Sequence, residues 1–226
     1  TDETIIEAAR MSTNKGFEGW DKDFKLLTYL YKNGHHTPFE MCELAIEVQA
    51  PIFVLREWMR HRTQSYNEMS ARYVQMPDLH YVPSLDRIQK QSQTNKQGSG
   101  ESLGPEEAAR ICDNLAEEQD DIYSMYQCLL DEGVSKEVAR INTPVSRYSK
   151  MRAKANLRNW LGFLNLRMRE NAQWEIRQYA NVVGDIISIH TDPRWGGSFE
   201  LIKKARSFTQ KPILAKGIHA QDAEIE

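Results

Sequence analysis

A short segment, residues 60–73 (RHRTQSYNEMSARY, the polar segment), is the feature of this chain that ordinary helix packing explains least. A solvated helix face alternates charged and apolar residues at helical spacing, whereas Tyr66, Met69 and Tyr73 are almost the only apolar members here. Its three arginines offer planar forks to phosphate oxygens and flat faces to aromatic rings, while serine, asparagine and glutamate supply directional hydrogen bonds. The composition favours a site for phosphates and heteroaromatic rings.

The residues before the polar segment predict a strand followed by a helix. From Met41 to Ala50 apolar and polar residues alternate, which is typical of a strand with one buried face. Pro51 then opens a helix at its first position, where the missing N–H costs nothing, and Ile52, Leu55 and Trp58 give the helix an apolar stripe. We expect this helix to run directly into the polar segment and hold it at a fixed place.

The rest of the chain predicts mainly helices. We expect them at residues 3–11, 23–33, 105–133, 156–170 and 174–190, with a short helix after Ser135 and a short strand within residues 142–152. The long helix should point Ala108, Ile111 and Met125 inward. The fold class is therefore α+β: a single domain, residues 1–206, with a mainly antiparallel sheet packed with several long helices.

Three segments fall outside this regular pattern. Residues 89–104 are rich in Gln, Ser, Asn and Gly and predict a mobile loop. Residues 207–226 predict a loosely held tail, after a possible last turn of helix at 198–206. Because the chain already looks helical at its start, we expect a strand to be missing before Thr1.

Composition narrows the class of protein. The 29 Lys and Arg residues against 32 Asp and Glu give a net charge of -3, so no polyanion-binding surface is expected. Cys42, Cys112 and Cys128 lack paired or CxxC spacing, which predicts reduced thiols and a cytoplasmic protein. No apolar run approaches the ~20 residues of a spanning helix, so no membrane association is expected.

Several chemistries are disfavoured by the pattern of residues. His35 and His36 are adjacent and His61 is flanked by arginines that would repel a divalent cation, so no metal site is predicted. Ser65 and Ser70 lack the GxSxG context of a serine hydrolase. Neither GxGxxG nor GxxxxGK[ST] occurs, so a bound dinucleotide would lie outside the Rossmann and P-loop schemes.

One alternative to an enzyme stays open at this stage. The arginines and tyrosines of the polar segment could serve a non-catalytic nucleic-acid-binding module, with phosphates on the arginines and bases stacked on the rings. That alternative predicts tight, strongly salt-dependent oligonucleotide binding. The net charge of -3 counts against it, and we expect no nucleic-acid partner.

The polar segment resembles the signature of the flavin-dependent thymidylate synthases, the thymidylate synthase complementing protein family. That signature reads RHRxxSxNExSxRY, and every fixed position is filled here. The resemblance covers roughly residues 5–190. It continues in His35–Glu40, Ala50–Val54, Val138–Arg140, Asn156–Arg158, Phe163–Arg167 and Ala172–Ile176.

The resemblance implies reductive methylation of dUMP to dTMP. In that family 5,10-methylenetetrahydrofolate gives the carbon, NADPH reduces a bound FAD, and the reduced flavin returns a hydride. The family is a homotetramer whose active sites combine residues from several subunits. It needs no cysteine nucleophile on uracil, and none of the three cysteines here lies in the signature.

Site residues follow from the resemblance, position by position. Arg167 is the expected catalytic residue, stabilising negative charge at N3 and O4 of the pyrimidine. The expected dUMP contacts are Glu57, Trp58, Met59, Arg60, Glu68, Met69, Ser70, Ala71, Arg72, Arg140 and Arg167. The expected FAD contacts are Ser12, Thr37, Arg60, His61, Arg62, Thr63, Glu68, Asn156, Leu157, Arg158 and Gly162. His35, Glu40 and Tyr73 match the folate and flavin region.

Two positions depart from the family's pattern. Position 57 is usually glutamine and is Glu57 here, so its carboxylate must face the base or pair with Arg60 rather than meet phosphate. Position 162 is usually asparagine and is Gly162 here, which removes a flavin hydrogen bond worth about 0.5–1.5 kcal/mol. Both changes bear on affinity rather than on the class of reaction.

Overall fold

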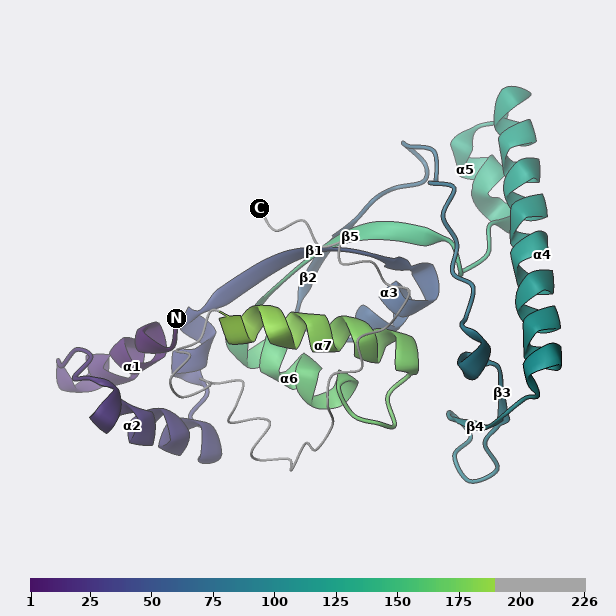
Figure 1. The fold of residues 1–226 in the computed structure, drawn as a ribbon. Helices are drawn as coiled ribbons and strands as arrows, with labels where there is room; N and C mark the ends of the chain where they lie inside the picture. The colour runs from purple at the N-terminus through teal and green to yellow at the C-terminus, as the bar shows by residue number, and fades with distance from the viewer. Residues whose placement is uncertain (190–226) are drawn as a thin grey trace. The chain divides into compact units, whose positions relative to one another are not determined.

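The computed structural model describes residues 1–189, which fold into an α+β arrangement of helices and small sheets (Figure 1). The residues group into two compact units that alternate along the sequence. Unit 1 comprises Thr1–Ile46, Met59–Tyr66 and the chain from Ala153 onward, and unit 2 comprises Glu47–Trp58 and Asn67–Arg152. The predicted domain end at 206, the possible helical turn at 198–206 and the tail 207–226 lie outside the described residues.

Unit 1 is built mainly from helices. They are α1 (Asp2–Arg10), α2 (Trp20–Lys32), α6 (Leu157–Arg167) and α7 (Trp174–Ile189), with the 3-10 turns η1 (Met11–Thr13) and η2 (Thr37–Met41). Ile5, Leu27, Phe39 and Leu161, from four of these elements, are buried in one apolar cluster. Side chains from α1, α2, η2 and α6 thereby form one core, and α7 lies beside α6 (Figure 1).

The N-terminus of α6 confirms a capping prediction. The Asn156 side chain accepts a hydrogen bond from the Asn159 N–H at 3.0 Å, which satisfies one of the unpaired donors of the first turn. Trp160 is fully buried, and its indole N–H donates to the Leu44 carbonyl at 3.0 Å. The helix ends at Arg167, three residues before the predicted end at Glu170, so Arg167 is its last residue.

Three strands form a sheet in the order β1 (Glu43–Pro51), β5 (Tyr148–Asn156), β2 (Ser65–Glu68). The strand predicted at residues 41–50 is confirmed as β1, with its ends shifted to 43 and 51. More exposed and more buried residues alternate along most of it, as predicted. β5 starts at Tyr148, inside the predicted 142–152 strand, and runs four residues further. Residues 149, 151, 153 and 155 are buried and their neighbours exposed, which is the signature of a strand with one covered face.

The polar segment is not a continuation of the helix before it, and that prediction is wrong. Pro51 is the last residue of β1, and α3 (Ile52–Trp58) ends before the polar segment begins. The polar segment then forms a turn, the short strand β2 and a second turn. In unit 2, the Met69 N–H donates to the Lys150 carbonyl at 2.8 Å, so backbone pairing with the β5 strand replaces helical bonding there.

Unit 2 contains the longest helix, α4 (Pro105–Asp131), followed by α5 (Lys136–Ala139) and the 3-10 turn η4 (Arg140–Asn142). Gly133 has a φ of +83° and ends α4 as predicted. The predicted inward face is confirmed at Ala108, which is buried, and is wrong at Met125, which is 59% exposed, while Gln119 and Tyr126 are buried without having been predicted. Both buried residues hydrogen-bond to backbone: Gln119 donates to the Tyr81 carbonyl at 3.2 Å, and the Tyr126 hydroxyl accepts from the Met76 N–H at 3.1 Å.

The segment 89–104 contains a small antiparallel hairpin rather than a purely irregular loop. β3 (Gln89–Gln91) pairs with β4 (Ser99–Ser102), and η3 (Leu85–Arg87) precedes them. The strands consist of polar residues, so the alternation of apolar and polar residues that reveals a half-buried strand is missing from the sequence.

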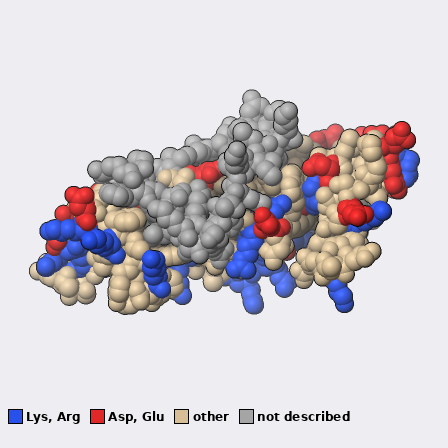
Figure 2. Space-filling view, turned by 60° about the horizontal axis from the view of Figure 1, so that its bottom comes forward, with Lys and Arg blue, Asp and Glu red and all other residues tan. Residues whose placement is uncertain are grey.

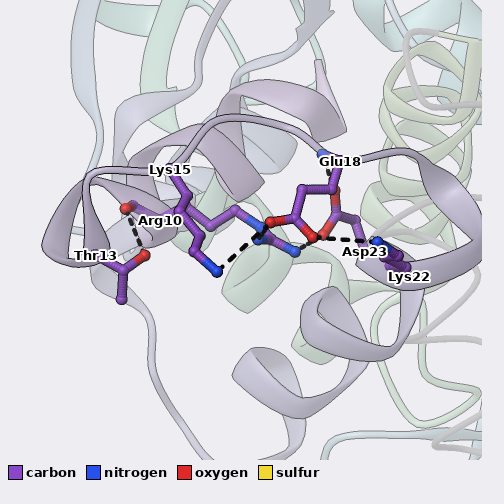
Figure 3. A network of polar contacts seen from close by, with 6 residues as sticks. All are labelled: Arg10, Thr13, Lys15, Glu18, Lys22 and Asp23. Atoms are coloured by element: carbon purple, nitrogen blue, oxygen red, sulfur yellow. Dashed lines mark hydrogen bonds and ion pairs between the residues drawn. The ribbon is translucent and has the colours of Figure 1, made fainter.

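An ion-pair network joins α1 to the start of α2 (Figure 3). The fully buried Asp23 carboxylate accepts from the Arg10 guanidinium and, at 2.7 Å, from the Glu18 N–H. Arg10 also meets the Glu18 carboxylate at 2.7 Å, while Lys15 and Lys22 approach Glu18 at 3.9 and 3.7 Å. The hydrogen bond to Asp23 raises the pKa of Arg10.

Candidate active site

Unit 1 contains a cavity of about 390 Å³, within the size range of small-molecule sites. Its wall brings together the end of α2, the η2 turn, the start of the polar segment and α6. The lining residues are Tyr31, His36, Phe39, His61, Thr63, Arg158, Asn159, Leu161, Gly162, Phe163, Asn165 and Leu166. Aromatic and aliphatic surface suited to a flat ring is thus combined with cationic and amide groups.

Helix α6 supplies one side of the cavity because of its spacing. Arg158, Gly162, Asn165 and Leu166 are three or four residues apart and therefore lie along one face of the helix. The opposite face carries the buried Trp160 and packs into unit 1. The Asn156 cap fixes the residue at which this helix begins. It therefore also fixes the position of each lining residue along the helix axis.

Side-chain hydrogen bonds to two backbone carbonyls hold the start of the polar segment in place beside α6. The Asn159 amide donates to the Thr63 carbonyl at 3.1 Å, and the Tyr66 hydroxyl donates to the His61 carbonyl at 2.8 Å. Burial raises the pKa of Tyr66 to about 12, so its hydroxyl keeps its proton and remains a donor. His61 and Thr63 consequently stand at fixed positions on the wall.

His61 and Arg167 form a direct polar contact beside the cavity wall. The Arg167 Nε–H donates to His61 Nε2 at 2.7 Å, and the imidazole meets the Phe163 ring edge to face at 4.9 Å between centroids. Burial, and next the Arg167 charge, lower the pKa of His61 to about 4. Arg167 does not line the cavity itself, but it is hydrogen-bonded to His61, which does.

The lowered pKa of His61 predicts how the free energy of unfolding depends on pH. Unfolded chains carry a histidine pKa of about 6.5, so between pH 6.5 and 4 the unfolded state binds more protons at His61 than the native state. The native state is therefore destabilised as the pH falls through this window, and above pH 6.5 the effect is absent. Urea unfolding of the wild type and His61→Gln at pH 7.5 and 4.5 should show a larger acid loss for the wild type. An equal loss in both would contradict the lowered pKa.

A second charged pair stands at the cavity. Arg158, a lining residue, donates to the Glu40 carboxylate, and both side chains are partly exposed. Glu40 lies in the η2 turn. The pair therefore fixes an arginine of α6 against this turn at the mouth of the site.

Unit 2 holds another group of the predicted residues. Ala71 is buried in one cluster with Ala139 and Tyr126, which brings the end of the polar segment beside α5. The Ser70 Oγ accepts from the Arg72 N–H at 3.3 Å, and the Arg72 guanidinium pairs with the Glu137 carboxylate at 3.3 Å. Arg140 follows α5 directly at the start of η4. Within this chain, the segments of Arg72 and Arg140 lie together.

The predicted flavin residues are only partly gathered by the cavity. His61, Thr63, Arg158 and Gly162 line it. The others do not line it: they are Ser12, Thr37, Arg60, Arg62, Glu68, Asn156 and Leu157. Of these, Asn156 acts as the cap of α6, and the Ser12 hydroxyl donates to the Ala9 carbonyl at 3.1 Å.

The predicted nucleotide residues are distributed in a similar way. Trp58 is fully buried, Glu57 and Met59 are partly buried, and Glu68 and Tyr73 are exposed. The unit 1 cavity is not lined by Glu57, Glu68, Ser70, Arg72 or Arg140. Their shared role stays a prediction.

Sequence reasoning missed several wall residues. His36 lines the cavity, while the predicted His35 is exposed and lies against the Tyr29 ring at 5.7 Å. Phe39 and Phe163 were classed only as core or as motif members, although each also faces the cavity. No local signal in the sequence separates His36 from its neighbour His35, because which ring lines the cavity depends on tertiary packing.

Gly162 stands out on the cavity wall because a Cβ built on it meets no heavy atom within 4 Å. A glycine inside a helix costs ~1 kcal/mol relative to alanine. Gly162→Ala should therefore raise the free energy of unfolding of the ligand-free protein by up to ~1 kcal/mol, measured by urea titration. Asn114→Ala, at an exposed site inside α4, is the matched control for helix propensity. A Gly162→Ala chain less stable than wild type would show that the site is occupied by protein atoms.

The chemistry of the site does not suit a metal. Among the residues that the structure describes, no group of three or more His, Cys, Asp or Glu side chains is placed to hold an ion. The three cysteines are free thiols, and burial raises the pKa of Cys42 and of Cys112. Within residues 1–189, no helix has the length and apolarity needed to cross a bilayer.

Solved structures share this fold. The UMP/dUMP methylase PolB from Streptomyces cacaoi bound with 5-Br UMP matches with a TM-score of 0.75 and 32% identity, covering 84% of each chain. The same methylase bound with 5-Br dUMP matches with a TM-score of 0.78 and 29% identity, covering 91% of each chain.

Sequence comparisons point to the same family. The flavin-dependent thymidylate synthase of Wolbachia pipientis wMel is 43% identical over 187 residues, and that of Ehrlichia ruminantium (strain Gardel) is 38% identical over 213. These alignments cover 83% and 94% of this chain, which spans 66% and 72% of the two relatives. A family model described as thymidylate synthase complementing protein matches residues 1–190. The chain therefore belongs to the thymidylate synthase complementing protein family, as the polar segment predicted.

Proposed function

We propose that this chain is a flavin-dependent thymidylate synthase that methylates dUMP to dTMP. 5,10-Methylenetetrahydrofolate supplies the carbon and NADPH the reducing equivalents. The observation that carries the proposal is the cavity of unit 1, where the start of a complete family signature lies against α6. The chain is also similar in sequence to proteins named flavin-dependent thymidylate synthase. Two solved neighbours at 32% and 29% identity are structures of a UMP/dUMP methylase, bound with 5-Br UMP and with 5-Br dUMP, which supports a uracil nucleotide as substrate.

The residues of the cavity fit a flavin. Phe39, Phe163 and Leu166 offer flat apolar surface, and Arg158 offers a cation for the anionic part of FAD. Gly162 leaves open space where a side chain would otherwise project. His61, Thr63, Arg158 and Gly162 would hold the group, which when bound supplies hydride chemistry to the site.

The protein's own residues have three tasks in this reaction. Arg72 and the backbone around Ser70 bind the nucleotide phosphate, because a guanidinium and N–H groups both donate to its oxygens. The Arg72 pair with Glu137 is exposed, so it opens at little cost when phosphate arrives. Arg167 stabilises negative charge that develops on the pyrimidine, and apolar wall residues exclude water around it.

The proposed assembly is a homotetramer with active sites shared between subunits. It is supported by the way the expected ligand residues divide between the two units, with some at the unit 1 cavity and others in the Arg72 and Arg140 region of unit 2. Light scattering with activity measured on each eluted species tests it. An active isolated monomer would contradict the proposal.

An anaerobic assay tests the activity itself. Purified protein should be yellow from bound FAD, and with dUMP, methylenetetrahydrofolate and NADPH it should form dTMP. UMP belongs in a parallel reaction, because the solved neighbours are described as UMP/dUMP methylases. If UMP is methylated and dUMP is not, UMP is the substrate in place of dUMP. Turnover by flavin-free protein would refute the mechanism.

The alternative of a nucleic-acid-binding module has little support. The face drawn in Figure 2 carries Lys and Arg side chains beside Asp and Glu side chains in several places, rather than one basic surface. An oligonucleotide titration in low salt is the corresponding test, and salt-sensitive binding without flavin would favour this alternative.

A further inference from the structure

Residues 76–83 (the anchored segment) follow the polar segment and run alongside α4 in unit 2, outside the helices and named strands (Figure 1). Side chains of α4 bind the backbone of this segment at both of its ends. At one end the Cys112 thiol donates to the Pro83 carbonyl at 3.2 Å, and at the other the Tyr126 hydroxyl accepts from the Met76 N–H at 3.1 Å. Helix α4 thus supplies hydrogen-bond partners that a neighbouring strand would otherwise provide.

Met76 is held at both of its backbone polar groups. Its N–H donates to the Tyr126 hydroxyl, and its carbonyl accepts from the Tyr123 hydroxyl at 3.3 Å. The two tyrosines are three residues apart and therefore project from one face of α4. Because Pro77 follows, Met76 is restricted to extended backbone and is kept out of a helix. A phenol hydroxyl can either donate or accept, so this pair (the tyrosine clamp, Tyr123 and Tyr126) satisfies both groups.

A buried arginine holds one side of the tyrosine clamp. The guanidinium of the fully buried Arg147 lies 4.4 Å from the centroid of the Tyr123 ring, a cation–π contact. The same guanidinium meets the Asp78 carboxylate at 3.2 Å and donates to the Gln119 carbonyl at 3.2 Å. These contacts restrict the Tyr123 ring, which carries the hydroxyl that binds Met76.

The turn that carries Arg72 ends two residues before Met76. Within this turn, the N–H groups of Tyr73 and Val74 both donate to the Ser70 carbonyl, at 3.0 and 3.1 Å. The internal bonds make the turn move as one body. Holding Met76 therefore limits where the guanidinium of Arg72, which is about half exposed, can lie.

Apolar packing joins the tyrosine clamp to the second expected phosphate ligand. Ala71 and Met76 are buried in one cluster with Tyr126 and Ala139. Ala139 directly precedes Arg140 in the chain. The residue that the clamp holds thus packs between the turn of Arg72 and the start of the Arg140 turn.

We propose that Tyr123 and Tyr126 are positioning residues that hold the turn of Arg72 in place for a nucleotide phosphate, beside the segment of Arg140. They act through the Met76 backbone and not by contact with the nucleotide. A binding turn that is ordered before its ligand arrives loses less conformational entropy on binding. The inference rests on the proposed function for the identity of the ligand, whereas the clamp itself can be measured without a ligand.

Removal of the two hydroxyls tests the positioning role, because phenylalanine keeps each ring in place. Tyr126→Phe should raise KM for dUMP about 10-fold, and Tyr123→Phe, with the longer bond, about 3-fold. The kcat per bound flavin and the FAD content should stay within ~2-fold of wild type, since lost binding that is uniform along the reaction leaves kcat unchanged. Anaerobic initial rates of the flavin-loaded full chain give KM and kcat, and calorimetry gives Kd for dUMP.

Cys112→Ala is the matched control. Cys112 lies on the same helix and binds the other end of the anchored segment, so its loss weakens the docking of that segment away from Arg72. KM for dUMP should stay within ~2-fold of wild type, with thermal unfolding recorded for every variant. An increase in KM equal to that of Tyr126→Phe, or an unchanged KM in the Tyr123→Phe/Tyr126→Phe double variant, would reduce the clamp to a stabilising role and overturn the proposal.

Hydrogen exchange at the Met76 amide tests the clamp in the ligand-free protein. Tyr126→Phe should speed this exchange at least ~10-fold, because the amide loses its acceptor, and Cys112→Ala should leave it unchanged. A wild-type Met76 amide that exchanges as fast as an exposed one would overturn the proposal whatever the activity. A wild type that neither binds dUMP nor forms dTMP would instead refute the proposed function, and the exchange result alone would then decide whether the clamp exists.

Discussion

Replacing Arg167 with alanine should reduce dTMP formation on the order of 10³-fold while the protein stays yellow. Arg167 ends α6 and is anchored on His61 beside the cavity, so its guanidinium is already oriented before any ligand arrives. The expected flavin contacts include Arg158 and Thr63, which line the cavity and which the substitution leaves in place. The measurement is dTMP formed per bound flavin under anaerobic conditions, with FAD content read from the visible spectrum.

Two controls make the result specific to Arg167. Arg169→Ala removes an exposed neighbouring arginine whose Nε donates to the Asn165 carbonyl, and it should leave turnover within a few fold of wild type. Arg167→Lys keeps the charge but loses the planar fork, so an intermediate rate is expected. Near-normal turnover by Arg167→Ala would remove this residue from the catalytic role.

The second large effect concerns stability. Asp23→Ala should lower the free energy of unfolding by about 3 kcal/mol, because it leaves the largely buried Arg10 charge without its main partner. The value falls at the lower end of the range for broken buried pairs since Glu18 still meets Arg10 at 2.7 Å. The lost acceptor for the Glu18 N–H adds to the cost. Urea unfolding at pH 7 gives the number.

Lys22→Ala is the matched control for the Asp23 substitution. Lys22 belongs to the same network (Figure 3), but its side chain is 70% exposed and its nitrogen lies 3.7 Å from the Glu18 carboxylate. Exposed pairs contribute about 0–1 kcal/mol, so this change should be nearly silent. A comparable loss in both variants would mean that long-range charge, and not burial, dominates the network.

The sequence predicted most elements of the fold, and its errors have identifiable causes. β1 and α7 were found from apolar periodicity, and α6 from Asn156 and its apolar stripe, because each has a clearly one-sided pattern. The inward face of α4 was misplaced because Gln119 and Tyr126 bury polar atoms that find backbone partners. Such burial depends on distant segments and has no local signal.

The candidate site was predictable to a different degree. The polar segment identified the family from its own residues, since a long signature constrains many side chains at once. The cavity could not be derived in this way, because its wall combines residues near 31–39, 61–63 and 158–166. His36 in place of His35, and the wall positions of Phe39 and Phe163, follow from tertiary packing alone.

The alternation of the two units along the chain has a consequence for synthesis on the ribosome. Unit 1 takes its parts from residues 1–46, 59–66 and the chain beyond 153, so contacts such as Trp160 with Leu44 close loops of more than a hundred residues. Contacts of such long sequence separation slow folding, because the entropy of loop closure is lost before packing compensates it. The unit 1 cavity, which needs α6, therefore cannot form until residues 157–167 have been translated. Under the proposed function, flavin binding consequently has to follow the synthesis of this late helix.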